Sequence, residues 1–215
     1  MKYTTIPHSN LRVSKICLGT MTWGNQNTPA EGFEQMDYAL DAGVNFFDTA
    51  ELYPVPATAD TYADTERIMG DWFAARNNRD QVVLATKIAG PGAYTAHIRT
   101  TGFTPSSIRE ALEGSLTRLK TDYIDLYQLH WPERNANFFG KRDYFPDADE
   151  QWEENFQAIL ETLEAFVQEG KIRHIGLSNE TPWGAMKYLT LSEHKNLPRA
   201  KTIQNPYSLL NRTFE

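Results

Sequence analysis

Residues 104 to 127 read TPSSIREALEGSLTRLKTDYIDLY, and this stretch decides the fold class. Its first part predicts a helix from Pro105 to Lys120, because four apolar side chains recur on one helical face. They are Ile108, Leu112, Leu116 and Leu119. Its last part, Tyr123 to Tyr127, has the length and apolar character of a buried strand. A helix that leads directly into a strand is typical of a βα unit.

The same pairing of strand and helix recurs along the chain. Five further apolar runs have the length of a strand. They are Ile16 to Gly19, Val44 to Phe47, Val82 to Ala85, Ile172 to Ile175 and Thr202 to Gln204. A second clear helix is predicted from about Gln151 to Glu169, with Gly170 as its C-terminal cap. Strands that alternate with helices in this order predict an α/β fold with parallel strands.

Local signals mark where several elements begin. Three helix starts show Thr followed by Pro, in which the Thr oxygen caps free N–H groups and Pro occupies the first turn. They are Thr28-Pro29, Thr104-Pro105 and Thr181-Pro182. Glu31 completes a capping box with Thr28. The segment from Lys2 to Ile16 alternates around Ser9 and Asn10, which predicts an N-terminal β-hairpin.

Two phosphate-binding signatures of open α/β sheets are missing from the sequence. A dinucleotide-binding sheet usually carries G-x-G-x-x-G after its first strand, and the run from Gly19 to Gly24 does not match it. The phosphate loop G-x-x-x-x-G-K-[ST] does not occur either. A bound nucleotide is therefore not expected to be held in the Rossmann manner, and a βα barrel is favoured.

Polar residues stand where successive apolar strands end. They are Asp48, Lys87, His130, Ser178, Asn179, Gln204 and Asn205. In a βα barrel the C-terminal ends of the strands converge on one face, so side chains far apart in sequence meet in one pocket. An Asp, a Lys and a His that meet near a Tyr are typical of a proton-transfer site.

Acid–base chemistry assigns a role to each of these groups. A tyrosine has an ordinary pKa of about 10, and a nearby ammonium such as that of Lys87 is expected to lower it. Asp48 is expected to keep this buried ammonium charged. His130 is expected to donate a hydrogen bond to a substrate oxygen on which negative charge develops. The set suits the protonation of an alkoxide.

Six motifs together carry a specific resemblance. They are Leu18-Gly19-Thr20-Met21-Thr22, Phe47-Asp48-Thr49-Ala50-Glu51-Leu52-Tyr53, Ala85-Thr86-Lys87, Leu129-His130-Trp131-Pro132, Gly176-Leu177-Ser178-Asn179 and Ile203-Gln204-Asn205. The set resembles the aldo-keto reductase superfamily. The runs from Tyr53 to Pro56 and from Gln204 to Arg212 look most like the bacterial Tas-type branch, related to potassium-channel β-subunits. The resemblance covers the chain end to end and implies a TIM-type (β/α)₈ barrel with an N-terminal β-hairpin.

The resemblance also implies a reaction and a cofactor. It implies that Tyr53 acts as general acid, supported by Asp48, Lys87 and His130, while a nicotinamide supplies hydride to an aldehyde or ketone. NADP(H) is the implied cofactor. Its implied contacts are Thr20, Asp48, Ser178, Asn179 and Gln204. The implied substrate contacts are Trp23, Tyr53, His130 and Trp131.

The six predicted strand units fall short of the eight that a closed barrel of about 250 residues requires. We therefore expect residues 1–215 to form one barrel domain, an N-terminal portion whose last two βα units lie outside the chain. The resemblance places the pyrophosphate loop and the residues that bind the 2′-phosphate beyond Glu215. An open six-stranded sheet exposes two pairing edges.

Other interpretations remain open for these residues. Singly, Asp48 can cap a helix, Tyr53 can lie on a loop, Lys87 can be solvated and His130 can be a core histidine, but jointly they favour catalysis. A regulatory or sensing subunit that binds the cofactor with little turnover is the alternative function. A metal-dependent hydrolase needs several converging ligands, so no metal site is predicted. The acidic, aromatic segment from Glu133 to Glu150 is either a substrate lid or a surface loop.

Composition limits the partners of this chain. A net charge of −7 and a pI near 5.3 argue against a surface that binds nucleic acid. Cys17 is the single cysteine, and the first residues lack the apolar core of a signal peptide, so a reducing cytoplasm is expected. No apolar run reaches the length of about 18 residues that spans a membrane. The partner that the resemblance implies is a small carbonyl compound.

Overall fold

The computed structural model describes residues 1–139 and 143–212. At its N-terminus, β1 (Tyr3–Thr5) pairs with β2 (Arg12–Ser14) in an antiparallel hairpin. The hairpin and its turn carry a small buried cluster, which packs against the first residues of two strands of the main sheet. The cluster is Ile6, Leu11 and Val13, with Phe46 and Val83 packed against it. The predicted hairpin is confirmed, and it covers the N-terminal ends of the strands.

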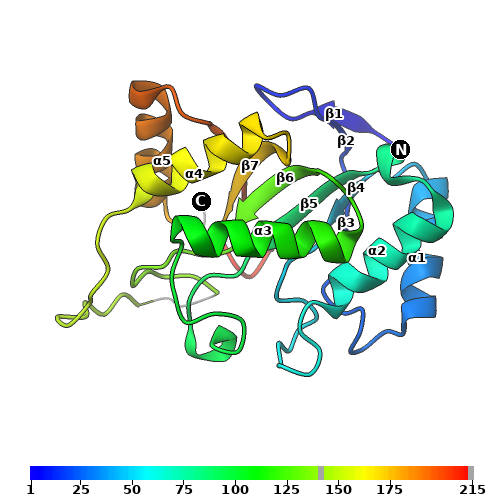
Figure 1. The fold of residues 1–215 in the computed structure, drawn as a ribbon, viewed down its shortest axis with the longest axis horizontal. Coiled ribbons are helices and arrows are strands. Elements are labelled where there is room, and N and C mark those ends of the chain that lie inside the picture. The colour runs from blue at the N-terminus through cyan, green and yellow to red at the C-terminus, as the bar shows by residue number, and fades with distance from the viewer. Residues whose placement is uncertain (140–142, 213–215) are drawn as a thin grey trace.

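Six strands form one parallel sheet, and neighbours in the sheet are neighbours in the chain (Figure 1). They are β3 (Cys17–Gly19), β4 (Phe46–Asp48), β5 (Val83–Ile88), β6 (Ile124–Leu129), β7 (Ile172–Ser178) and β8 (Ala200–Gln204). All six predicted strands are confirmed. The sheet curls as part of a (β/α) barrel, and within the described residues β3 and β8 each have one strand neighbour.

Helices connect the strands and cover one face of the sheet (Figure 1). They are α1 (Pro29–Asp41), α2 (Asp64–Arg76), α3 (Pro105–Leu119), α4 (Phe156–Gln168) and α5 (Pro182–Lys195), with short 3₁₀ turns η1 (Arg79–Gln81) and η2 (Ala93–Thr95). The side chains of Thr28, Thr104 and Thr181 each cap a helix as predicted. Glu31 completes the capping box, and Gly170 follows α4 with a φ of +73°.

One helix start differs from the prediction, and another was not predicted. Helix α4 begins at Phe156, because the backbone of Asn155 is not helical; the Nδ2 of Asn155 donates to Glu133 Oε2 at 2.8 Å and holds this residue in place before the helix. The prediction of a start near residue 151 is therefore wrong. Helix α2 follows Ala63, which has a φ of +61° and provides no side-chain cap. Residue types that usually cap helices stand close by, at Thr61, Asp64 and Thr65, but the residue in the N-cap position is Ala63.

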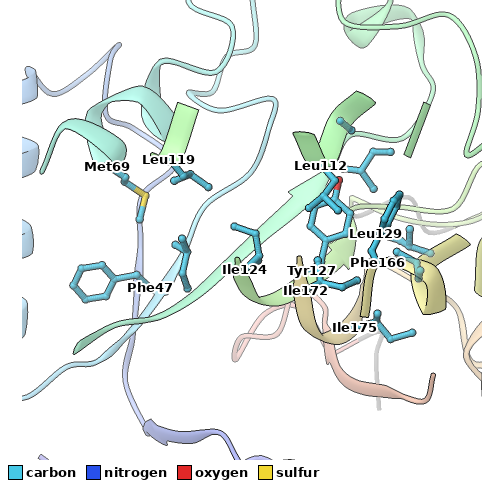
Figure 2. Packing of buried hydrophobic residues seen from close by; sticks show 14 of the residues in the cluster. Phe47, Met69, Leu112, Leu119, Ile124, Tyr127, Leu129, Phe166, Ile172 and Ile175 are labelled. Atoms are coloured by element: carbon cyan, nitrogen blue, oxygen red, sulfur yellow. The ribbon is translucent and has the colours of Figure 1, made fainter. Parts of the chain in front are cut away.

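The main hydrophobic core lies between the sheet and the helices (Figure 2). Helix side chains pack there against strand side chains; among those labelled in the figure are Met69, Leu112, Leu119 and Phe166 from helices and Phe47, Ile124, Leu129, Ile172 and Ile175 from strands. Each fully buried aliphatic or aromatic side chain stabilises the fold by about 1.5–3 kcal/mol. This packing fixes the strands, and with them the polar residues at their C-terminal ends.

Candidate active site

Three polar side chains meet at the C-terminal ends of two adjacent strands. Asp48 ends β4, Lys87 lies in the neighbouring β5, and Tyr53 lies in the loop that follows β4. Lys87 Nζ donates to Asp48 Oδ2 at 2.6 Å and to the hydroxyl of Tyr53 at 3.4 Å. It also donates to the carbonyl oxygen of Thr49 at 2.8 Å. All of these groups are buried, so a cation, a carboxylate and a phenol share a site with little water.

Hydrogen bonds hold the loop of Tyr53 against β5. The backbone N–H of Glu51 donates to the carbonyl oxygen of Lys87 at 3.0 Å. In return, the N–H of Ala89 donates to the Glu51 carboxylate at 2.9 Å. Arg99 forms an ion pair with the same carboxylate, and both side chains are almost fully buried. The phenol is thereby carried on a fixed loop, which favours a defined geometry.

His130 joins the group from the next strand. It directly follows β6, and its ring lies edge-on to that of Tyr53, with centroids 5.6 Å apart. Its Nδ1 is buried and has no hydrogen-bond partner among the described residues. Buried polar atoms are nearly always paired, because desolvation without a partner costs free energy. His130 therefore retains hydrogen-bonding capacity that the described part of the protein does not use.

Burial and the neighbouring charges shift the pKa values of the groups in this site. Burial raises the pKa of Tyr53, and this effect outweighs the lowering by Lys87. The sequence-based expectation that Lys87 lowers the tyrosine pKa is thus wrong in its net direction, because desolvation of the phenolate dominates. Burial lowers the pKa of Lys87, but Asp48 and Tyr53 more than compensate and leave it raised. Burial, and then Lys87, hold the pKa of His130 well below its usual value.

At neutral pH these shifts define one protonation state. Tyr53 keeps its proton, Lys87 is an ammonium, and His130 is a neutral imidazole. A neutral imidazole carries one N–H donor and one acceptor nitrogen. The site can therefore release a proton from a phenol and donate a hydrogen bond from an imidazole to the same small polar atom.

One buried residue of the site was missed by the sequence analysis. Gln128 of β6 donates from Nε2 to Asp48 Oδ1 at 3.0 Å. Since Lys87 binds Oδ2, both oxygens of the Asp48 carboxylate have a partner. A glutamine in an apolar strand is a weak signal by itself, and only the strand register brings it beside Asp48.

Trp131 lies beside Tyr53 in a small apolar cluster that is separate from the main core. The cluster contains Ala50, Leu52, Tyr53, Ala89 and Trp131. The Tyr94 ring stacks on Trp131 at 5.5 Å, and Phe139 contacts it edge-on at 5.6 Å. Both covering rings are about half exposed, at 48% and 50%. Contact of Trp131 with a substrate stays a prediction, and it requires one of these rings to move.

Trp23 does not join this cluster. It is buried in the main core, and its Nε1 donates to Gln35 Oε1 at 2.9 Å. Because its side chain has almost no exposed surface, the structure places it as a packing residue. The predicted contact between Trp23 and a substrate therefore has no support from this geometry.

The segment from Glu133 to Glu150 forms a surface loop within its described residues, and residues 140–142 lie outside them. Asn135 ties the loop to itself, because its Nδ2 donates to the carbonyl oxygen of Phe145 at 2.8 Å. Phe139 connects the same loop to Trp131. The loop thus borders the candidate site, and its function as a lid stays a prediction.

The predicted cofactor contacts lie together at the C-terminal ends of β7 and β8. Ser178 and Gln204 are partners in the parallel register, and the N–H of Asn179 donates to the Gln204 carbonyl oxygen at 2.9 Å. The Asn179 side chain donates to Ser178 Oγ at 3.0 Å and to the carbonyl oxygen of His130 at 2.9 Å. These amide and hydroxyl groups are therefore linked to His130, on the neighbouring strand end.

The donors and acceptors at this edge fit the carboxamide of a nicotinamide cofactor. Ser178 and Gln204 supply a hydroxyl and an amide, which both donate and accept hydrogen bonds. Next to them, Asn205 has a buried Oδ1 without a partner among the described residues, and a ligand N–H can satisfy it. Thr20 is already occupied, since its hydroxyl donates to the carbonyl oxygen of Asp48 at 3.0 Å. Thr20 lies in the site, but its hydroxyl is not free to bind a ligand as a donor.

In residues 1–139 and 143–212, no group of three or more His, Cys, Asp or Glu side chains is arranged to hold a metal ion. Over the same part of the chain, every helix is too short or too polar to cross a membrane.

The model of the Aldo/keto reductase family matches residues 15–215. The chain is 47% identical over 226 residues to Protein tas of Escherichia coli strain K12, an alignment that covers 100% of this chain and 62% of that protein. It is 39% identical over 220 residues to the uncharacterized oxidoreductase YrpG of Bacillus subtilis strain 168, covering 100% of this chain and 60% of that protein. The chain thus spans about three fifths of the length of these relatives.

A solved structure supports the same architecture. The fold matches that of a thermostable aldo-keto reductase, Tm1743, crystallised with the inhibitor epalrestat, with a TM-score of 0.73 and 22% sequence identity. The match covers 99% of this chain and 65% of that one. At this identity the comparison establishes the fold alone, and it confirms the prediction of a partial (β/α) barrel.

Proposed function

The chain belongs to the aldo/keto reductase family, and from this premise we propose that its protein reduces an aldehyde or ketone to an alcohol with NADPH. One observation carries the proposal: Lys87 Nζ contacts both Asp48 Oδ2, at 2.6 Å, and the Tyr53 hydroxyl, at 3.4 Å. A phenol that keeps its proton beside a fixed ammonium is suited to donate that proton to a developing alkoxide.

In the proposed reaction Tyr53 is the general acid. Its raised pKa means that Oη holds its proton at neutral pH and is ready to transfer it. As the proton leaves, negative charge grows on Oη, and the ammonium of Lys87 stabilises that charge. Asp48 keeps Lys87 in the ammonium form, since its carboxylate offsets the cost of burying the cation. The pair therefore stabilises the charge that the proton transfer creates.

His130 is proposed to orient the carbonyl oxygen. Its low pKa makes it a neutral imidazole, which donates one N–H without adding a positive charge that competes with Lys87. Its ring lies edge-on to that of Tyr53, with centroids 5.6 Å apart, and we propose that the carbonyl oxygen binds between the two side chains and accepts from both. A second donor aimed at the same oxygen stabilises negative charge that develops there.

Ser178, Asn179, Gln204 and Asn205 are proposed to hold the cofactor carboxamide at the ends of β7 and β8. When bound, the nicotinamide supplies the hydride that the substrate carbon receives. Because these residues fix the carboxamide, one face of the nicotinamide ring points toward the Tyr53 hydroxyl. The binding energy of the carboxamide thus also orients the ring. Trp131 and the Tyr94 ring that covers it are proposed to form the apolar wall beside the substrate.

The test compares two tyrosine variants of the whole protein. Tyr53→Phe should lower turnover of aldehydes and ketones by roughly 100- to 10,000-fold, the usual contribution of general acid catalysis. NADPH affinity, measured by fluorescence, should be nearly unchanged. Tyr127→Phe is the matched control, because Tyr127 is also buried but lies in the main core and its hydroxyl has no partner among the described residues. Its turnover should equal that of the unmodified protein.

A scan of aldehydes, ketones and quinones with NADPH and NADH defines the substrate and nucleotide preference. Full activity of Tyr53→Phe would reject Tyr53 as the acid. If the protein binds NADPH tightly but reduces no carbonyl compound, a regulatory or sensing role replaces the proposed one. A preference for NADH would contradict the proposed nucleotide but not the proposed reaction.

A further inference from the structure

A row of residues crosses the face of the sheet that lies opposite the helices, here called the inner face, beside the proposed catalytic groups. The parallel register pairs Lys87 of β5 with Gln128 of β6, and Gln128 with Gly176 of β7. Register partners on one face of a sheet lie within contact distance of each other. The row therefore extends from the ammonium of Lys87 to Gly176, which has no side chain.

Gln128 occupies this row with its amide aimed at Asp48. Its Nε2 lies 3.0 Å from Asp48 Oδ1, and its side chain is almost fully buried, at 2% exposed. An ionised carboxylate only accepts hydrogen bonds, so the amide must present its nitrogen and not its oxygen to Asp48. The contact is therefore directional, and it holds one carboxylate oxygen while Lys87 binds the other.

Gly176 leaves room for this arrangement. A β-carbon at this position would lie 3.1 Å from Cγ of Gln128 and 2.4 Å from Oγ1 of Thr202. The second distance is shorter than any normal contact, so a larger residue would displace Thr202 and press on the Gln128 side chain. This explains why glycine stands here in a β-strand, where it is otherwise unfavourable.

We infer that Gln128 is a positioning residue that orients the Asp48 carboxylate, and through it Lys87, toward the hydroxyl of Tyr53. The inference rests on the proposed function and adds a residue to it. The contacts form one chain: Gln128 Nε2 to Asp48 Oδ1 at 3.0 Å, Asp48 Oδ2 to Lys87 Nζ at 2.6 Å, and Lys87 Nζ to Tyr53 Oη at 3.4 Å. Without the amide, Asp48 Oδ1 loses the one side-chain donor that the described residues supply to it, and Lys87 alone then orients the carboxylate.

A double-mutant cycle tests this chain of contacts in the whole protein. Gln128→Met keeps the length of the side chain and removes the donor, and it should lower kcat by roughly 10- to 100-fold with little change in KM. In an Asp48→Asn background the same substitution should change kcat less than about twofold, because Gln128 then has no carboxylate to orient. Additive effects of the two substitutions would overturn the inference, since a purely structural role predicts them.

The Gln128→Glu variant provides a second, independent test of the inference. Two facing carboxyl groups share one proton at low pH and repel each other when both ionise. The variant should therefore lose activity as pH rises, over a range in which circular dichroism shows it to be folded. A pH profile that parallels that of the unmodified protein contradicts the inference. Leu126→Val, on the same strand and also buried, controls for lost packing and should keep kcat within about twofold.

A measurement without substrate separates this inference from the proposed function. The ¹³Cζ resonance of Tyr53 in ¹³C-tyrosine-labelled protein, assigned with Tyr53→Phe, reports the charges around the phenol. It should move in Gln128→Met and stay in place in Leu126→Val. If no carbonyl compound is reduced but the resonance moves, the proposed function fails and the positioning contact stands. An unmoved resonance overturns the contact whatever the turnover.

Discussion

Two buried ion pairs lie on opposite faces of the same strand, and their comparison indicates what distinguishes the proposed reactive site from a structural ion pair. Lys87 pairs with Asp48 at 2.6 Å on the inner face of β5. Arg118 of α3 pairs with Glu66 of α2 at 2.7 Å on the helix-covered face. Both pairs are largely buried. Neither burial nor the sign of the charges separates them.

The partners of each pair make the difference. Thr86 donates to Glu66 Oε1 at 2.6 Å and Arg118 donates to Oε2, so the carboxylate joins two helices to β5 and both of its oxygens are occupied. Thr86 precedes Lys87, and the alternation of side chains along a strand sends them to opposite faces. Lys87 donates a hydrogen bond to the hydroxyl of Tyr53, a phenol that keeps its proton, whereas Arg118 contacts the phenol of Tyr62 through the face of its ring, 5.4 Å from the centroid. We attribute the proposed reactivity of Lys87 to this hydrogen bond, and the structural role of the other pair to its complete pairing.

The largest expected effect is on catalysis, through Lys87→Met. The change removes the cation that stabilises charge on the Tyr53 hydroxyl, so turnover per folded molecule should fall roughly 100- to 10,000-fold. Steady-state kinetics, corrected for the folded fraction by thermal denaturation, measure it. Arg118→Met is the matched variant on the other face, and its turnover per folded molecule should stay within about threefold. Equal losses in both variants would remove the distinction between the two pairs.

The second effect is on stability and concerns the other pair. Arg118→Met leaves the fully buried carboxylate of Glu66 without its cation, which should lower the free energy of unfolding by about 3–5 kcal/mol. Urea denaturation measures this change. Arg109→Met, on the same helix, breaks an exposed ion pair with Glu169 and should cost no more than about 1 kcal/mol. A similar cost for both arginines contradicts a structural role for the buried pair.

His130 makes the inner face sensitive to acid. Its folded-state pKa is well below the ordinary value because of burial and Lys87, so below pH ~6.5 the unfolded chain binds a proton that the folded protein does not. The free energy of unfolding should therefore fall as pH drops below ~6.5, by about 1.4 kcal/mol per pH unit until the folded imidazole itself titrates. His130→Asn should remove this part of the slope in urea titrations at pH 7 and pH 5. His174→Asn, at a less buried histidine with a lowered pKa, should remove less. An unchanged slope in His130→Asn shows that the imidazole is not held neutral.

The strands and the polar residues at their ends could be predicted because those signals are local. An apolar run followed by Asp48 or Lys87 is visible in a few residues, and parallel strands place such ends on one edge. The register of the strands, by contrast, is not encoded by neighbouring residues. Gln128 contacts Asp48 across 80 positions of sequence, and Arg118 contacts Glu66 across 52, so nothing near either residue indicates its partner. Both contacts appear only once the strands and helices are packed.

The direction of the Tyr53 pKa shift was predicted incorrectly for a related reason. The sequence shows that a lysine follows a neighbouring strand, which indicates an attractive charge. It does not show how deeply the phenol is buried, and burial is the larger effect. Trp23 illustrates the same limit, because an aromatic residue near a motif can line a cleft or fill a core, and here it fills the core.

The smallest expected effect distinguishes an unpaired hydroxyl on the helix-covered face from a paired hydroxyl in the N-terminal hairpin. Tyr127 is buried there, and its hydroxyl has no partner among the described residues, while burial and nearby carboxylates raise its pKa and keep it neutral. Tyr127→Phe removes an unsatisfied polar atom without leaving a large cavity, so it should stabilise the protein by about 1 kcal/mol and raise Tm by about 2–4 °C. Tyr3→Phe is the opposite control, because the Tyr3 hydroxyl donates to the carbonyl oxygen of Gly43 at 2.8 Å and its loss should lower Tm. If Tyr127→Phe lowers Tm as much as Tyr3→Phe does, the hydroxyl of Tyr127 has a partner in solution, and the helix-covered face contains a further polar contact.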